Sequence, residues 1–119
     1  MVSYRWTIYW FDLDPVKGSE QSGKRPVLVI SANAVNRALP IVTILPLTSA
    51  KPGRKVFSIE TLLSPEESGL AKSSIVMAHQ IRTISSDRLG KACGEVRSPG
   101  RRREILLALA KHLDLPISI

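Results

Sequence analysis

The chain has 119 residues, of which 44% are hydrophobic and 23% charged, and its formal net charge is +7. This length and composition predict one folded domain over residues 1–119 with a core of its own. There is no apolar run long enough to cross a bilayer, no secretion signal in the first ten residues and only one cysteine, Cys93, so we expect a cytoplasmic protein without disulfides.

The positive charge indicates a polyanionic partner. The 17 Lys and Arg residues outnumber the 10 Asp and Glu residues. Nucleic acid is the first expectation, and an acidic membrane or an acidic protein is the second. Because aromatic residues make up only 5% of the chain, we expect phosphate contacts rather than a broad stacking platform to dominate binding.

The first part of the chain reads as strands and loops. Residues 4–13 are apolar on both alternating sides, which predicts a strand packed on both faces, and Pro15 ends it. After a polar loop, residues 26–30 predict a second strand buried on both faces. Residues 31–40 read as a loop with at most one helical turn.

A third strand is predicted at 41–47, and Pro46 inside it argues for an edge or a bulge. Two hydroxyl residues, Thr48 and Ser49, stand at its end. Residues 51–55 form a basic turn, 56–60 a half-buried strand and 61–72 a loop.

The last third holds the longest predicted strand, 74–84, then a turn or 3-10 segment at 86–90 and a strand at 92–96. One helix follows, with Ser98 as N-cap and Pro99 in its first turn. Its apolar side is predicted to consist of Ile105, Leu106, Leu109, Ala110 and Leu113, and Pro116 marks its end. The pattern predicts a mainly β fold: a bent antiparallel sheet or small barrel with a C-terminal helix packed on it.

The stretch 18–31 carries the most distinctive residues. A loop with two glycines and two serines runs into the buried strand, and Arg25 stands at the junction. Pro26 drives the residue before it into extended geometry, so the guanidinium is held where a polar loop meets the core. This position suits a group that meets a charged ligand. The alternative is a solvated surface charge.

Several common catalytic arrangements are absent from the sequence. One Cys and two His residues supply no metal-binding cluster, and there is no phosphate-binding glycine loop and no nucleophile elbow. We therefore expect no metal and no cofactor. His79 is predicted to share a strand face with Ile75 and Met77 and to be a core or interface histidine. His112, near the helix end, suits a helix-dipole or packing role.

Five blocks carry a resemblance. They are residues 12–15 (DLDP), 18–21 (GSEQ), 24–31 (KRPVLVIS), 45–49 (LPLTS) and 79–85 (HQIRTIS) with Arg88-Leu89. In order and spacing the chain resembles the MazF/PemK endoribonuclease toxins of bacterial toxin–antitoxin systems. It departs at Arg5-Trp6-Thr7, where that family usually has Arg-Gly and an acidic residue. The departure touches the start of the sheet and not the blocks of the site.

The resemblance implies an SH3-like barrel with a C-terminal helix, a two-fold dimer and cleavage of single-stranded RNA at short motifs without a metal. It implies that Arg25 and Thr48 are catalytic. The candidate substrate-binding residues are Ser19, Glu20, Gln21, Lys24, Ser49, Arg54, His79, Gln80 and Arg82.

RNA cleavage suits these residue types. The RNA 2′-OH is the nucleophile, so the protein needs only to align it, stabilise charge on the phosphate and assist proton transfer. Arg25 can direct two donors at phosphate oxygens, and Thr48 can donate a hydroxyl to the same group. The arginine side chain stays protonated in proteins, so it does not readily serve as a general base. Glu20 and His79 both remain candidates for accepting the proton.

We expect a dimer with a basic groove lined by Lys24, Arg25, Arg54 and Arg82, and an acidic antitoxin that lies in this groove. Two alternatives belong to other classes. One is a non-catalytic toxin of the same fold that binds DNA gyrase, as CcdB proteins do. The other is a basic nucleic-acid-binding module without chemistry.

Overall fold

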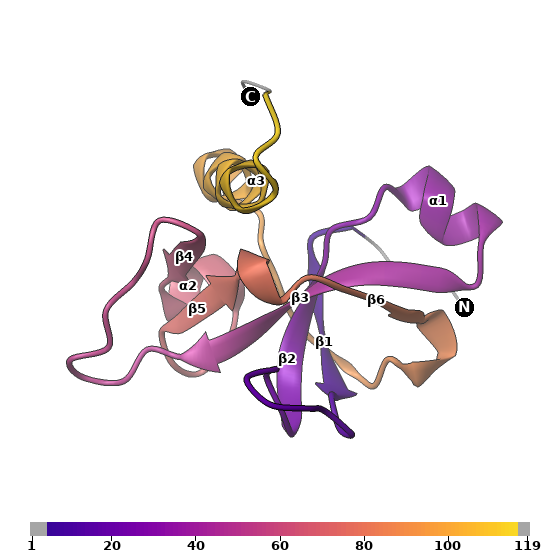
Figure 1. Cartoon of the computed structure of the whole chain (residues 1–119), viewed down its shortest axis with the longest axis horizontal. Helices are drawn as coiled ribbons and strands as arrows, with labels where there is room; N and C mark the ends of the chain where they lie inside the picture. The colour runs from indigo at the N-terminus through magenta and orange to yellow at the C-terminus, as the bar shows by residue number, and fades with distance from the viewer. Residues whose placement is uncertain (1–4, 117–119) are drawn as a thin grey trace.

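Strand β3 (Ile41–Ser49) organises the sheet. The computed structural model describes residues 5–116. Seven strands pair antiparallel in the order β4-β5-β3-β2-β1-β7, and β6 pairs with the first half of β3 (Figure 1). The other strands are β1 (Thr7–Asp12), β2 (Lys24–Val29), β4 (Glu60–Leu63), β5 (Ser74–Met77), β6 (Arg82–Ser85) and β7 (Ala92–Glu95). The helices are α1 (Asn33–Ala38), α2 (Pro65–Ser68), α3 (Pro99–Leu113) and the 3-10 turns η1 (Ala78–Gln80) and η2 (Ser86–Arg88).

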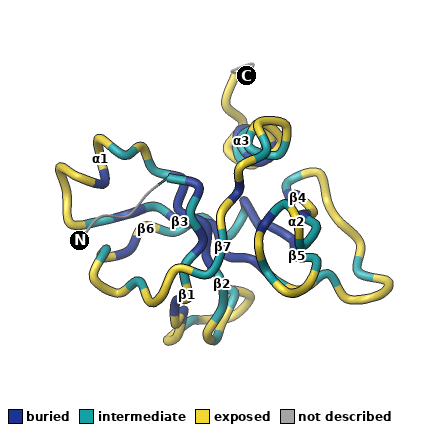
Figure 2. Tube along the Cα trace, turned by 180° about the vertical axis from the view of Figure 1, so that it is seen from behind, coloured by how far each residue is buried: buried dark blue, intermediate teal, exposed yellow. Residues whose placement is uncertain are grey.

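Strand β2 separates two apolar clusters, which is why its run of β-branched residues is buried on both faces. Leu28 belongs to a cluster that also contains Ile105 of α3. Val27 and Val29 belong to a second cluster on the opposite side, with residues of β1, β3 and β6. The buried stretches in Figure 2 accordingly run through the middle of the sheet, with exposed loops around them. The predicted strand at 26–30 and its burial are confirmed.

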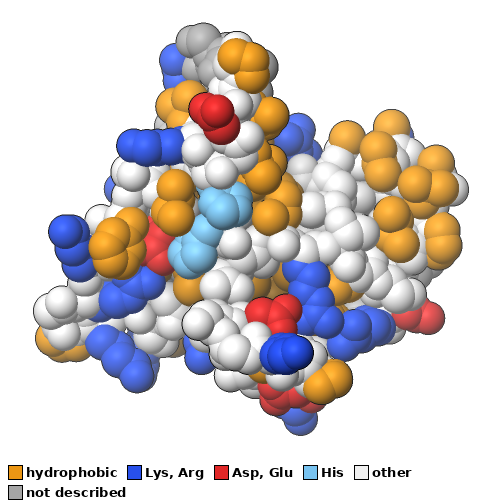
Figure 3. Space-filling model, in the orientation of Figure 1, with side chains coloured by type: hydrophobic (Ala, Val, Ile, Leu, Met, Phe, Trp, Pro, Cys, Tyr) orange, Lys and Arg blue, Asp and Glu red, His pale blue; other side chains and the backbone are white. Residues whose placement is uncertain are grey.

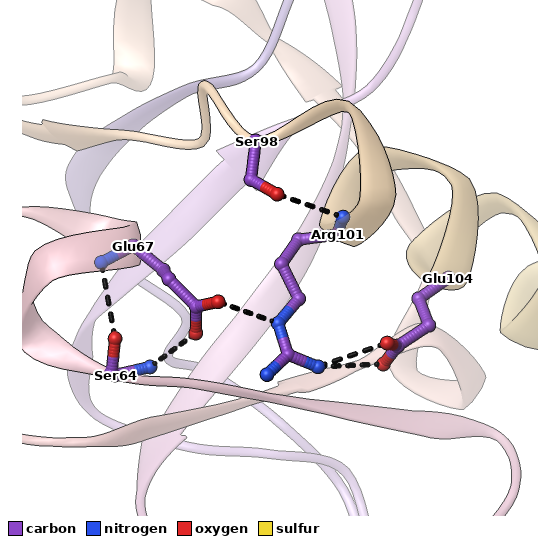
Figure 4. A network of polar contacts seen from close by, with 5 residues as sticks. All are labelled: Ser64, Glu67, Ser98, Arg101 and Glu104. Atoms are coloured by element: carbon purple, nitrogen blue, oxygen red, sulfur yellow. Dashed lines mark hydrogen bonds and ion pairs between the residues drawn. The ribbon is translucent and has the colours of Figure 1, made fainter.

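Helix α3 covers one side of the curled sheet, and its start is built as predicted. The Ser98 hydroxyl accepts from the Arg101 backbone N–H at 3.2 Å, and Pro99 occupies the first turn. The Arg101 guanidinium donates to Glu67 of α2 at 2.8 Å and to Glu104 at 2.9 Å, so it ties the two helices together (Figure 4). Leu113, predicted on the buried side, is 46% exposed. The small antiparallel barrel with a C-terminal helix is confirmed as a curled, half-barrel sheet with α3 against it.

The single long strand predicted at 74–84 is wrong. The chain forms β5, turns through η1 and continues as β6. The reason lies in β3, whose second half pairs with β5 at Leu47–Ser49 and whose first half pairs with β6 at Ile41–Ile44. The segment 74–85 pairs with both halves of the bent strand β3, so the segment has to turn between the two pairings.

Pro46 lies where the strand paired with one edge of β3 changes from β6 to β5. Of the two predicted alternatives, an edge strand or a bulge, the edge strand is wrong, since β3 is central and Pro46 itself pairs with Val27 of β2. Neither of the two registers on the other side includes Leu45 or Pro46, so a residue without a backbone N–H is tolerated there.

The prediction of a half-buried strand at 56–60 is also wrong. Val56 and Phe57 are exposed, and β4 begins at Glu60. The Phe57 backbone N–H donates to the Glu60 carboxylate at 3.1 Å and so closes a turn. The region predicted as a loop at 61–72 contains most of β4 and all of α2. Helix α2 begins with a reciprocal capping box between Ser64 and Glu67.

Strand β1 begins beside a strained residue. Of the predicted strand, Tyr4 lies outside the described residues. Trp6 has φ 75°, a conformation that a bulky side chain rarely adopts, and it occupies the position where the family usually has glycine. Its N–H donates to the Val29 carbonyl at 2.7 Å and its carbonyl accepts from the Val96 N–H at 2.8 Å. Its ring is only 7% exposed, so burial and sheet bonds hold the backbone there.

Candidate active site

Arg25 and Thr48 are neighbours in space on adjacent strands. Arg25 is the second residue of β2, and Thr48 lies at the end of β3. The Arg25 guanidinium donates from Nη1 to Thr48 Oγ1 at 3.2 Å and from Nε to the Ser22 carbonyl at 2.7 Å. Both side chains are half-buried, so their polar ends reach solvent from a rigid sheet. The structure thus brings together the two residues predicted to be catalytic.

These two residues line a shallow cavity of about 190 Å³, together with the candidate substrate-binding residues Lys24 and Ser49. Trp10, Pro26, Leu47 and Ser74 complete its lining. We call this cavity the Arg25 pocket. No carboxylate and no imidazole is among the described residues that line it. It therefore presents two cationic side chains and three hydroxyl groups to whatever it binds.

A chain of hydrogen bonds links the Arg25 pocket to η1. The Gln21 side-chain amide faces Arg25, and its oxygen, turned to the guanidinium, accepts from Nε and Nη2 at 2.7 Å each. The Gln21 backbone N–H donates to Gln80 Oε1 at 3.1 Å, and Gln80 Nε2 donates to the Ser19 carbonyl at 3.4 Å. The loop before β2 is therefore fastened at one end to η1 and at the other to Arg25.

A second cavity of about 230 Å³ adjoins this loop, and we call it the Gln80 pocket. Five of the predicted residues line it: Glu20, Gln21, His79, Gln80 and Arg82. The Glu20 carboxylate accepts from the Lys17 backbone N–H. Arg82 donates to the Leu13 carbonyl at 2.9 Å, and its guanidinium lies 5.8 Å from the centre of the Phe11 ring. Gln21 belongs to this pocket and also contacts Arg25, so it connects the two.

His79 lies on η1 and not on a strand face, which corrects the prediction of its local structure. Its ring contacts that of His112 on α3, with 6.3 Å between centroids and an angle of 67° between planes. The two rings are visible side by side in Figure 3. His79 is half-buried, and its Nδ1 is buried without a hydrogen-bond partner among the described residues. His112 thus has the packing contact that its helix position suggested.

Arg54 is occupied elsewhere. Its guanidinium forms two hydrogen bonds with the buried Glu60 carboxylate, at 3.0 and 2.8 Å, and it lines neither pocket. Burial of Glu60 raises the pKa of its carboxyl, but hydrogen bonds from Arg54 and the Phe57 N–H, together with the Arg54 charge, outweigh burial. The net pKa of Glu60 is therefore lowered. Arg54 is a partner in a structural ion pair rather than an open phosphate ligand.

Sequence reasoning missed Trp10 as a residue of the site. It predicted a packed strand, but Trp10 is 46% exposed and lines the Arg25 pocket. Its alternation with apolar neighbours hid this, since Ile8 and Phe11 on the same strand are buried. The one available signal is the antiparallel register, which sets Trp10 opposite Pro26, the residue after Arg25.

Known proteins resemble this chain over nearly all of its length. Residues 4–113 match the family described as the PemK-like, MazF-like toxin of type II toxin–antitoxin systems. The chain belongs to the PemK/MazF toxin family. It is 36% identical to endoribonuclease MazF9 of Mycobacterium tuberculosis over 93% of this chain and 96% of that protein. It is also 36% identical to endoribonuclease EndoA of Bacillus subtilis over 75% of this chain and 76% of that protein.

Solved structures of MazF-family proteins share the fold. A mycobacterial endoribonuclease in complex with its cognate antitoxin superposes with a TM-score of 0.78 at 31% identity, covering 98% of this chain and 99% of that one. The sequence-based prediction of a MazF/PemK-type endoribonuclease toxin is confirmed by these relatives, and the gyrase-binding alternative is not supported. Within residues 5–116 there is no helix that is both long and apolar enough to span a membrane.

Proposed function

We propose that this toxin cuts single-stranded RNA at short sequence motifs, without a metal ion, by attack of an RNA 2′-OH on the adjacent phosphate. The observation that carries the proposal is the contact between Arg25 and Thr48 at the mouth of the Arg25 pocket. Both residues are donors, and both are aimed at one small volume. Such an arrangement suits a phosphate whose charge grows during the reaction.

In this reaction the 2′-oxygen forms a bond to phosphorus and the bond from phosphorus to the 5′-oxygen of the next nucleotide breaks. The 5′-oxygen takes up a proton from solvent as it leaves, so the products are a cyclic phosphate and a 5′-hydroxyl. Arg25 holds two non-bridging oxygens through its planar fork, while Gln21 and Ser22 keep the fork oriented. Thr48 donates its hydroxyl to the same phosphate. Donors preorganised in this way are commonly worth about 10²–10³ in rate.

The 2′-OH proton needs an acceptor, and none of the described residues lining the Arg25 pocket is a carboxylate or an imidazole. Glu20 and His79 both line the adjoining Gln80 pocket. Glu20→Gln and His79→Gln variants, each compared with the parent in single-turnover cleavage, decide between them. The residue whose loss slows cleavage while leaving RNA affinity unchanged is the acceptor.

The proposed function also implies which partners the toxin has. We expect a two-fold dimer in the cytoplasm and a cognate antitoxin with an acidic segment that covers the RNA-binding surface. The mycobacterial endoribonuclease in complex with its cognate antitoxin supports the expectation of an antitoxin partner. Light scattering at micromolar concentration and co-purification with the product of the neighbouring gene test the two partners.

The deciding experiment is incubation of the purified chain with defined single-stranded RNA in the presence and absence of a chelator. Cleavage that persists in the chelator supports the proposal. Binding without cleavage would favour the basic binding module. Cleavage that stops with the chelator would overturn the metal-free mechanism.

A further inference from the structure

Trp10 lies between the Arg25 pocket and a third cavity of about 260 Å³. Trp10, Phe11, Asp12, Lys24, Arg88 and Gly90 line this cavity, whose walls are mostly apolar. We call it the Trp10 pocket. It shares Trp10 and Lys24 with the Arg25 pocket. A strand of RNA with its scissile phosphate on Arg25 would therefore have this cavity beside it.

The backbone of Trp10 is held by two hydrogen bonds to residues 90–91, so its side chain stands on a rigid element. Its N–H donates to the Lys91 carbonyl at 3.0 Å, and its carbonyl accepts from the Gly90 N–H at 2.7 Å. A Cβ on residue 90 would lie 2.8 Å from that carbonyl oxygen, so glycine permits the close approach. Trp10 is 46% exposed. Because its indole is rigid, it loses little side-chain freedom when a ligand packs against it.

Two cations stand at the Trp10 pocket. Lys24 and Arg88 are both exposed, and neither forms an ion pair among residues 5–116. Arg88 stacks 4.7 Å from the centre of the Phe11 ring and donates to the Asp12 carbonyl at 3.3 Å, which directs its guanidinium. The Asp12 carboxylate also lines the pocket, and one of its oxygens accepts from the Asp14 N–H at 3.0 Å. Lys24 and Arg88 together outweigh Asp12, so the residues that line the pocket carry one net positive charge beside an apolar wall.

We propose that the Trp10 pocket binds a nucleotide flanking the scissile phosphate, with its base stacked on the indole and its outer phosphate on Arg88. This inference rests on the proposed function and adds a subsite to it. An aromatic face with a nearby cation is the arrangement that binds unpaired bases, because every base has a π-face. Continuity with the Arg25 pocket and the charge of Lys24 and Arg88 favour this occupant over an acidic peptide, which would need no aromatic face.

The test uses a short RNA whose 2′-OH at the cleaved position is replaced by hydrogen, so that it binds without reacting. Trp10→Ala should weaken its binding about tenfold or more, whereas Trp10→Phe should retain most of the affinity. Phe57→Ala is the matched control, because Phe57 is 51% exposed and lies outside all three pockets. It should leave affinity unchanged.

A base-deletion series locates the contact. Replacing either flanking nucleotide by an abasic one should weaken binding to the parent at one of the two positions, and this penalty should vanish in Trp10→Ala. Arg88→Gln should reduce the slope of log affinity against log salt by about 0.7. An abasic penalty that persists undiminished in Trp10→Ala, with the parent still cleaving RNA, would overturn the subsite and leave the proposed function intact. A parent chain that neither binds nor cleaves RNA would overturn both.

Discussion

Gln21 and Gln80, 59 residues apart in the chain, are joined by a hydrogen bond of 3.1 Å from the backbone of the first to the side chain of the second. This bond fastens the loop before β2 to η1, and the Gln21 side chain in turn contacts Arg25. The guanidinium that we assign to catalysis is therefore oriented by a residue whose own position depends on η1, the turn between β5 and β6.

Replacing Gln80 should therefore lower activity through Arg25. Gln80→Ala removes the acceptor for the Gln21 N–H, and we expect faster hydrogen exchange at that amide and single-turnover cleavage slower by about tenfold. Gln80→Glu keeps an acceptor, so it should restore the protection of the Gln21 amide whatever its effect on RNA affinity. An unchanged exchange rate in Gln80→Ala would show that the loop is held by other contacts.

Arg25→Lys separates charge from geometry. Lysine keeps the positive charge but loses the planar fork that Gln21 and Ser22 orient. We expect RNA binding to survive while single-turnover cleavage falls by about 10² or more. A thermal melt checks folding. A Lys variant that cuts within about threefold of the parent would return Arg25 to the role of a surface charge.

Thr48→Val tests the second donor. It keeps the shape of the side chain and removes the hydroxyl that accepts from Arg25 at 3.2 Å. We expect a loss of cleavage similar to that of Arg25→Lys, and a double variant that is less impaired than the product of the two losses, because both donors act on one phosphate. Ser49→Ala, at the exposed neighbouring hydroxyl, is the comparison within the same pocket and should cost less. Fully multiplicative effects would argue that the two residues act on different steps.

The contact between Arg25 and Thr48 was predictable because Arg25 stands at the start of β2 and Thr48 near the end of β3, two strands whose apolar pattern is unambiguous. The break at Ala78–Gln80 was not, because apolar and polar residues go on alternating through it. The turn is needed because β5 and β6 pair with different halves of β3, and this pairing is evident only in the folded structure. For the same reason the sequence placed His79 on a strand.

Charge was the weaker guide to the site. Arg54 sits in a basic turn and reads as an open cation, but Glu60, six residues later, neutralises it inside the structure. Trp10 reads as a core residue, and only the lack of an element over it exposes its ring. Residue type and spacing do not reveal which side chains another element covers or pairs.

The pair formed by Arg54 and Glu60 makes stability depend on pH. The pKa of Glu60 is lowered in the folded protein, so ionised Glu60 stabilises the fold above its unfolded pKa of about 4.3. That stability is lost as the pH falls through the lowered folded value. We expect the free energy of unfolding, measured in urea, to drop as the pH falls from about 5 towards the lowered folded pKa, and to drop less steeply in Glu60→Gln.

At pH 7, Glu60→Gln should cost about 2 kcal/mol, less than a fully buried pair because the Arg54 side chain is 29% exposed. Glu95→Gln is the matched control, since Glu95 pairs with Arg97 on the surface, with side chains 42% and 84% exposed. Its effect should stay below about 0.5 kcal/mol. Equal costs for the two variants would contradict the buried role of Glu60.

The salt dependence of RNA binding should reflect open cations near the pockets rather than the whole net charge. Each phosphate contact contributes a slope of about −0.7 on logarithmic axes. Lys24→Gln should therefore make the slope shallower by about that amount. Arg37→Gln, an exposed change on α1, should leave it unaltered. A slope that is flat in the parent would mean that the charge of +7 serves only solubility.

The hydrogen-bonded chain from Gln80 through Gln21 to Arg25 also bears on how the toxin can be silenced. An inhibitor need not fill the Arg25 pocket. A partner segment could bind the loop before β2 and move it away from η1. The bond between Gln21 and Gln80 would then break, and Gln21 would no longer orient the Arg25 guanidinium. Such an inhibitor would act at a distance from the scissile phosphate, and RNA could still bind to the toxin that it had inactivated.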